Sequence, residues 1–280
     1  MMSERESGPG RRPFAATLLY PSEVVPNLQR LEAQLGAAGL FGTSVSPIDA
    51  DGSFVIRHPE PLRIEEGEAV ASICVTRALA VPFEPSAFRQ SWAWGWRQAS
   101  TAAEPARFAL TVGELTSLAM PVAERAHFLL ESVKALSEEH APLAISWPML
   151  ERFDEPLAFM EAETGPLQLV NVRLFVLVSP DAVRTFVMDT LGLSALGMLD
   201  LQLHFRGLEP ERMATYLYSL ADELLAEGPA EGLHSACPID DGSEVLGATG
   251  VPWMSRYEMS IMEPRRGVVD LTPEASFSAR

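Results

Sequence analysis

The chain has almost no lysine and little cysteine. Lys134 is the single lysine among 280 residues, and Cys74 and Cys237 are the two cysteines. A Schiff-base enzyme, or a nucleotide hydrolase with a phosphate-binding loop, needs a lysine at its centre. Lys134 lies inside a predicted helix and follows no glycine-rich loop, so both classes are disfavoured. Two cysteines without a CxxC pair give no disulfide framework and fit a reducing compartment.

Long apolar runs are missing as well. The run at 167–178 is interrupted by Asn171 and Arg173 and is too short to span a bilayer as a helix. A second run at 14–20 is stopped by Pro21, which makes it a poor core for a signal peptide. We therefore expect a soluble, cytoplasmic protein with no membrane partner.

Positive charge is scarce, because 38 acidic residues face 21 lysines and arginines, for a net charge of −17. Nucleic-acid binding requires a basic surface that displaces counterions from phosphate, so nucleic acid is not expected as a partner. Anionic membrane surfaces are disfavoured for the same reason. A charge of this sign serves solubility or attracts a basic protein.

The strict motifs of several enzyme classes do not occur. The sequence contains no GxSxG nucleophile elbow, HExxH zinc helix, GxGxxG dinucleotide turn or EF-hand loop. Polar side chains from distant positions can still converge on one site, so these absences exclude the strict forms alone. We expect no cofactor.

Hydrophobic spacing predicts the elements of the first half. The predicted strands cover 15–20, 52–57, 68–75, 106–112 and 142–147. The predicted helices cover 22–38, 86–100 and 121–140. Ser22 is expected to cap the first helix, and Pro59, Pro61 and Gly67 to mark the turn region between two strands. Trp92, Trp94 and Trp96 in the second helix are interpreted as core anchors rather than as a ligand platform.

Alternation of apolar and polar residues is cleaner in the second half. It predicts strands at 167–178, 199–206, 255–261 and 267–271, with an amphipathic helix at 209–227. Within 199–206, every second residue is polar, which is typical of an antiparallel sheet with one solvent-exposed face. The residues expected on that face are Asp200, Gln202, His204 and Arg206.

This order of elements predicts an α+β fold with a mainly antiparallel mixed sheet and helices packed on one face. We expect a disordered tail at 1–12, an N-terminal lobe at 13–165, a C-terminal domain at 166–272 and a tail at 273–280. The two halves have broadly similar element order, so two related lobes are an alternative reading of the same pattern.

Four segments carry a resemblance to a known family. They are TLGLSALGM at 190–198, the helix at about 209–226, IDDGS at 239–243 and EPRRGVVDL at 263–271. Their order resembles the bacterial domain of unknown function 4261 family over about 170–272, with a looser match upstream. The resemblance implies an α+β domain and a bacterial source, and it assigns no chemistry.

Two constellations are candidates for catalysis. His204 and Asp200 are four residues apart on the same predicted face of one strand. A histidine near an acid can act as a general base. Asp240 and Asp241 could bind a hard cation such as Mg²⁺ or Ca²⁺. The same Asp-Asp-Gly sequence also forms an ordinary turn, because aspartate satisfies backbone donors and glycine accepts a positive φ.

Arg256, Arg265 and Arg266 form a local basic cluster near the C-terminus. Their guanidinium groups could bind carboxylate or phosphate, or pair with the surrounding acids. Together with the polar side chains of 200–206, they are our candidates for a binding surface.

These observations favour a non-enzymatic interaction protein, most concretely an immunity or accessory protein of a bacterial toxin or secretion system. We expect it to bind a protein partner, and a basic protein is one option. A first alternative is a small-molecule hydrolase or metal-dependent enzyme that uses His204 with Asp200, or Asp240 with Asp241. A second alternative is a structural subunit of a larger assembly, and a homo-oligomer is left open.

Overall fold

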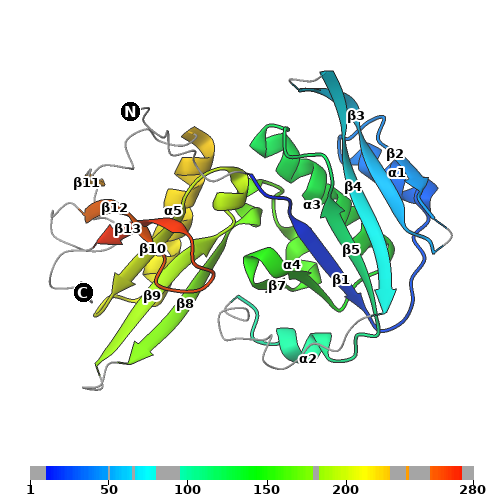
Figure 1. Ribbon diagram of the computed structural model, residues 1–280. Helices are drawn as coiled ribbons and strands as arrows, with labels where there is room; N and C mark the ends of the chain where they lie inside the picture. The colour runs from blue at the N-terminus through cyan, green and yellow to red at the C-terminus, as the bar shows by residue number, and fades with distance from the viewer. Residues whose placement is uncertain are drawn as a thin grey trace. The chain divides into compact units, whose positions relative to one another are not determined.

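Figure 1 shows the computed structural model, which describes residues 11–49, 51–64, 67–79, 95–178, 183–227, 238–239 and 253–272. The chain divides into two compact units. The first unit comprises Arg12–Leu169, and the described residues from Val170 onward, with Arg11, make up the second unit. Each unit has one sheet, and all but one of the strand pairings are antiparallel. The α+β prediction is confirmed.

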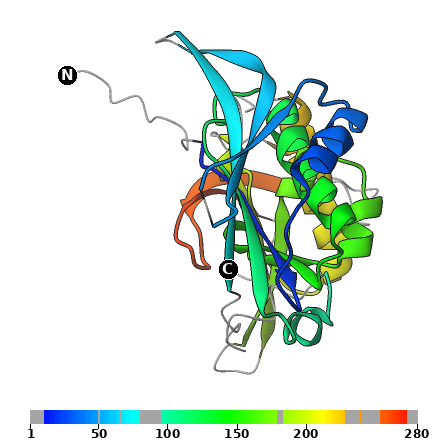
Figure 2. The ribbon, with the colours of Figure 1, turned by 90° about the vertical axis from the view of Figure 1, so that its right-hand side faces the viewer.

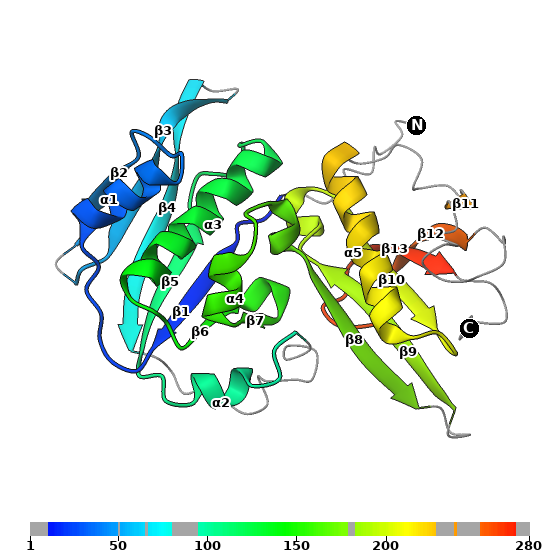
Figure 3. The ribbon, with the colours of Figure 1, turned by 180° about the vertical axis from the view of Figure 1, so that it is seen from behind.

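The sheet of the first unit has seven strands in the order β2-β3-β4-β5-β1-β6-β7, and its neighbours are antiparallel. Its strands are β1 (Ala15–Tyr20), β2 (Ser44–Pro47), β3 (Phe54–Ile64), β4 (Gly67–Leu79), β5 (Phe108–Glu114), β6 (Ala144–Trp147) and β7 (Arg152–Asp154). Its helices are α1 (Leu28–Ala37), α2 (Ala99–Ala103), α3 (Val122–Glu139) and α4 (Pro156–Glu161). Figures 2 and 3 show α1 and α3 on the same side of this sheet.

Local chemistry explains where α1 and α3 begin. Asn27 accepts hydrogen bonds from the backbone N–H groups of Gln29 and Arg30, both at 3.1 Å, and so caps α1. The predicted start at Ser22 is therefore wrong, and Val25, inside the predicted helix but before α1, is 66% exposed. Pro121 directly precedes α3, where its missing N–H costs nothing.

The hairpin of β3 and β4 is longer than predicted. Pro59 and Pro61 lie inside β3, whose last residue, Ile64, pairs with Gly67, the first residue of β4. The pairing register shifts between Arg57 and Pro61, which is how a strand accommodates prolines that cannot donate to a neighbour. The proposed turn region at these two prolines is thus a bulged strand.

The second predicted helix is described only in part. Trp92 and Trp94 lie outside the described residues. In the described portion, 95–100, the prediction is wrong for 95–98, which are not helical, and the short helix α2 begins at Ala99. Trp96 is partly buried and packs against a core cluster that includes Leu19 and Ala144. This contact agrees with an anchoring role for Trp96.

The sheet of the second unit has six strands in the order β11-β12-β13-β10-β9-β8. Its elements are β8 (Asn171–Val178), β9 (Arg184–Leu191), β10 (Asp200–Phe205), α5 (Pro210–Glu227), β11 (Pro238–Ile239), β12 (Trp253–Met259) and β13 (Gly267–Thr272). The pair β10 and β13 is parallel. Helix α5 lies over one face of this sheet, where it contacts β8 and β9 (Figure 3).

The segment 190–198 makes a tight connection between β9 and β10. Gly192 and Gly197 have φ angles of 118° and 94°, which a side chain would strain. Between them Ser194–Leu196 form a single 3-10 turn, and Leu193 is fully buried. The two glycines therefore let β10 return directly beside β9.

Candidate functional site

The first half of the polar face of β10 is buried, so the prediction that this face is solvent-exposed is wrong for Asp200 and Gln202. Asp200 and Gln202 are each 0% exposed. His204 is half-buried, and Arg206 alone of the four is exposed. The loop 260–266 lies over this face, as Figure 1 shows, whereas α5 lies on the opposite face. Alternation identified the polar side of the strand correctly but carried no information about what covers it.

Five polar residues form one row across the second sheet. Strand register places Arg173 opposite Asp189, Asp189 opposite Gln202, Gln202 opposite Asp270, and Asp270 opposite Arg256. Directly opposed residues in a sheet are close enough for their side chains to interact. Along the row the charges are positive, negative, neutral, negative and positive, so that Gln202 lies between two acids and an arginine stands at each end.

Arg173 and Asp189 form a buried bidentate ion pair. Arg173 Nε donates to Asp189 Oδ1 at 2.8 Å, and Arg173 Nη2 donates to Oδ2 at 2.5 Å. The guanidinium also lies 4.9 Å from the ring centroid of Phe175. The two side chains are 1% and 0% exposed. Paired N–H···O bonds of this kind are the strongest that arginine makes.

Arg266 joins two carboxylates. Its Nε donates to Asp200 Oδ2 at 3.0 Å, and its Nη2 donates to Asp189 Oδ2 at 2.9 Å. It also donates to the carbonyls of Thr190 at 2.6 Å and Pro264 at 2.9 Å. Arg266 therefore links β9, β10 and the loop 260–266 through one side chain that is 13% exposed.

Gln202 connects the row to the loop. Its Nε2 donates to Asp270 Oδ1 at 2.9 Å, and its Oε1 accepts from the backbone N–H of Ile261 at 2.6 Å. The loop is also held at Glu263, whose carbonyl accepts from Arg173 Nη1 at 2.9 Å. Side chains of the sheet thus fix the backbone of the loop at several points.

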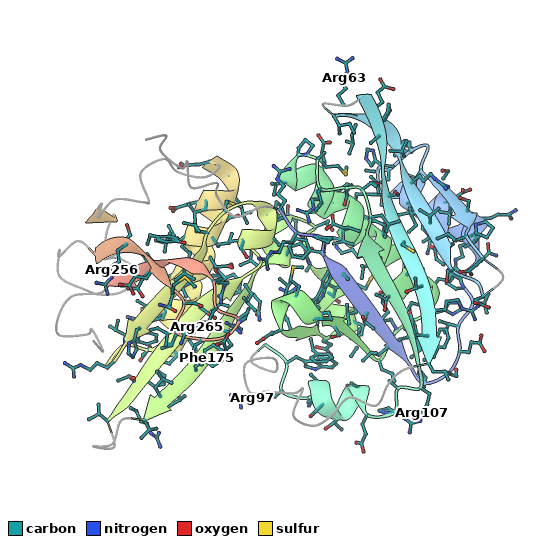
Figure 4. All side chains as sticks on the ribbon, viewed as in Figure 1. Arg63, Arg97, Arg107, Phe175, Arg256 and Arg265 are labelled. Atoms are coloured by element: carbon teal, nitrogen blue, oxygen red, sulfur yellow. The ribbon has the colours of Figure 1, made fainter. Side chains whose placement is uncertain are left out.

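Figure 4 labels the two arginines of the C-terminal cluster that reach the surface. The side chain of Arg256 is 47% exposed and lies 2.5 Å from Glu258 and 3.7 Å from Asp270. Arg265 is 58% exposed and lies 3.5 Å from Glu263. Each of these two arginines has a carboxylate partner, which agrees with the pairing interpretation.

Burial governs the ionisation of the two catalytic candidates. Desolvation raises the pKa of Asp200 above 3.8, and the nearby Asp189 charge adds to the rise. Arg266, together with a hydrogen bond from Ser194, offsets part of it. Desolvation lowers the pKa of His204 below 6.5.

The structure does not join His204 to Asp200. The two residues are separated by four positions on an extended strand, which corresponds to about 13 Å. His204 Nε2 lies 3.1 Å from Thr185 Oγ1. Asp200 Oδ1 accepts from the backbone N–H of Leu193 at 3.1 Å and from Thr190 Oγ1 at 3.2 Å. The two side chains thus belong to separate hydrogen-bonded groups.

The metal candidates Asp240 and Asp241 lie outside the described residues. Among the residues that the structure describes, no group of three or more His, Cys, Asp or Glu side chains has an arrangement that could hold a metal ion. In that same portion of the chain, no helix is both long and apolar enough to cross a membrane.

The first unit contains a second buried ion pair that sequence reasoning missed. Glu114 accepts from Arg125 Nε at 2.7 Å and Nη2 at 2.6 Å, from Ser117 Oγ at 2.6 Å and from the backbone N–H of Phe14 at 2.6 Å. Arg125 lies on α3 and is 0% exposed. The available signal was an acid at the end of β5 and a base in α3, the next long helix. Periodicity alone could not show that the two side chains meet.

A comparison with family models matches residues 189–272 to the Domain of unknown function (DUF4261). The predicted resemblance is confirmed over that range, which contains Asp189, Asp200, Gln202, Arg266 and Asp270. Comparisons with curated proteins and with solved structures found no match for this chain.

Proposed function

We propose that this chain is a non-enzymatic interaction protein, most concretely a cytoplasmic immunity or accessory protein of a bacterial toxin or secretion system. In this role it binds a protein partner in a stoichiometric complex. Its buried polar residues maintain the structure of the second unit, and its outer surface makes the contact.

The observation that carries the proposal is the way the buried polar groups of the second sheet are used. The carboxylate of Asp189 is engaged by Arg173 and Arg266, and that of Asp200 by Arg266 and by neutral donors. Gln202 uses both ends of its amide. A general base or nucleophile needs a group that can exchange partners with substrate, whereas these groups are committed to one another and to the loop 260–266.

Net charge suggests the character of the partner. A protein with a charge of −17 attracts a basic protein over long range and accelerates the encounter at low salt. We expect association with such a partner to slow as ionic strength rises.

The test is reconstitution with the products of adjacent genes. Each is co-expressed with this chain, purified and measured by size-exclusion chromatography with light scattering. The proposal expects one stoichiometric complex whose partner has an activity that this chain inhibits or supports. Turnover of a small substrate by the isolated chain, with no complex formed, would contradict it.

A hydrolase is the second candidate, and the buried Asp200 is the observation that favours it, because strongly perturbed carboxyl groups concentrate in active sites. Asp200→Asn separates the two functions. Loss of an activity at unchanged stability supports catalysis, whereas loss of stability without any activity to lose supports a role in the buried network.

A further inference from the structure

Strand β8 forms one edge of the second sheet as the structure describes it. An edge strand presents a row of backbone N–H and C=O groups on its outer side, which can pair with another strand. Which residues of β8 point outward is fixed by the alternation of the antiparallel pairing with β9.

A single hydrogen bond sets the phase of that alternation. The backbone N–H of Val172 donates to Tyr218 Oη of α5 at 3.3 Å rather than to β9. The backbone N–H of Val172 therefore points away from β9, and the backbone groups of every second residue after it do the same. By this rule the outward backbone groups belong to Leu174, Val176 and Val178.

The pairing of β9 with β10 agrees with this phase. If the backbone groups of odd-numbered residues in β9 point toward β8, those of even-numbered residues such as Thr190 point toward β10. The backbone N–H of Leu201 in β10 should then point toward β9, and it donates to Thr190 Oγ1 at 2.8 Å. Within the described ranges, no hydrogen bond outside the β8–β9 pairing involves the backbone of Leu174, Val176 or Val178.

The outer half of β8 also exposes apolar side chains. Val176 is 43% exposed and Val178 is 63% exposed. Val183, at the start of the returning segment, is 44% exposed. Proteins normally block such an edge with prolines or charged side chains. Residues 174–178 contain neither.

We propose that the β8 edge from Leu174 to Val178 binds an extended segment of a protein partner as a seventh strand of the second sheet. Backbone hydrogen bonds to the three outward residues supply affinity, and alternate apolar side chains of the segment pack on Val176 and Val178. The identity of a biological partner rests on the function proposed above, whereas the docking edge is tested separately.

Charge favours a segment from another protein that carries an acidic residue at one end. Arg184 pairs with Val178 in register, and its side chain is exposed. Its field acts within a Debye length of about 8 Å, so a partner that is basic overall can still place one carboxylate here.

A second copy of this chain fits less well at this edge. Self-pairing of β8 would bring the segment 171–178, which contains no acidic residue, against itself. Arg184 would then gain no carboxylate from the opposing strand, so a different protein is the better occupant.

The probe is a short synthetic peptide that alternates valine with threonine and ends in glutamate. Binding is measured by titration, and its position by amide hydrogen exchange at Leu174, Val176 and Val178. The inference expects exchange at these three amides to slow by tenfold or more, with no comparable change at the inward Arg173 and Phe175.

Val176→Pro removes one outward N–H and leaves the pairing with β9 intact, since proline is tolerated on the free side of an edge strand. We expect peptide affinity to fall at least tenfold. Val178→Lys is a second variant that blocks the edge without altering the backbone. Leu79→Ala, at an exposed apolar residue of the first unit, is the matched control and should bind as the wild type does.

Arg184→Glu should weaken the same peptide severalfold, whereas Arg212→Glu, at an exposed arginine on α5, should not. Equal affinity of the wild type, Val176→Pro and Val178→Lys would overturn the inference. Concentration-dependent dimerisation of the wild type that Val178→Lys abolishes would also overturn it, in favour of a second copy as occupant.

The outcomes separate this inference from the proposed function. A neighbouring gene product that binds wild type and Val178→Lys equally well would support the proposed function and refute the edge as its site. Peptide binding at the edge without any partner among the neighbouring products would support the inference and count against the proposed function.

Discussion

Replacing Arg266 by methionine should destabilise the second unit strongly. The substitution keeps the apolar stem of the side chain and removes the guanidinium that contacts Asp189, Asp200, Thr190 and Pro264. Asp189 keeps its pair with Arg173, but Asp200 is left fully buried with neutral donors alone.

The expected size follows from that imbalance. Removing one partner of a buried ion pair costs about 3–5 kcal/mol, because the remaining charge is uncompensated in a poorly polar site. Arg266 is slightly exposed and Asp200 retains hydrogen bonds, so we expect about 3 kcal/mol. The loop 260–266 also loses its attachment at Pro264, and its amides should exchange faster.

A double-mutant cycle isolates the pair. Arg266→Met, Asp200→Asn and the double variant are compared by urea unfolding, with hydrogen exchange across 200–205 as a probe specific to the second unit. The double variant should be more stable than the sum of the single changes implies, by about 1–3 kcal/mol. Arg212→Met, at an exposed ion pair, is the control and should change stability by less than about 1 kcal/mol.

Acidity supplies an independent check on the same pair. Burial raises the pKa of Asp200 above 3.8, and Arg266 counteracts that rise. The protonated form gains no ion pair, so the defect of Arg266→Met should shrink as pH falls from neutral toward the folded pKa of Asp200. Additive single changes, or a defect that does not depend on pH, would refute a compensated buried ion pair.

Three further predictions concern other residues. Glu114→Ala should destabilise the first unit by about 3–5 kcal/mol, because it leaves Arg125 buried without its carboxylate; thermal unfolding measures this, and a loss under about 1 kcal/mol would contradict it. Tyr20→Phe should leave stability unchanged or raise it by about 1 kcal/mol in urea unfolding, since the Tyr20 hydroxyl is buried and has no hydrogen-bond partner among the described residues; a clear loss would reveal a bond to that hydroxyl. Burial lowers the pKa of His204 below 6.5, so stability should fall as pH drops through 6.5 toward the folded pKa; His204→Gln should remove that part of the pH dependence, and identical profiles would show that His204 does not contribute.

Local pattern was a good guide to the elements and a poor one to their ends. The strand Ala15–Tyr20 and the helix Val122–Glu139 were predicted within a residue or so, because their spacing and flanking prolines are contained in the segment itself. Strand β9 was not predicted. Its inner half includes Asp189, whose burial depends on an arginine in another strand.

The row of five polar residues across the second sheet could not be predicted from the spacing of apolar residues, because its members and their partners are distant in sequence. Gln202 and Ile261 are 59 residues apart, and Gln202 and Asp270 are 68 apart. Alternation along β10 shows which side chains share a face. Whether that face meets water or a loop is decided by residues 260–266, which no local pattern connects to β10.

The position of β13 in the sheet affects the order in which the second unit can fold during synthesis. It is the last described strand in the chain, yet it lies inside the sheet between β12 and β10. During synthesis, β8, β9 and β10 leave the ribosome well before Arg266 and Asp270 exist. For that interval the nascent chain carries Asp200 without Arg266 and Gln202 without Asp270, so the buried contacts of β10 cannot be completed until translation reaches β13.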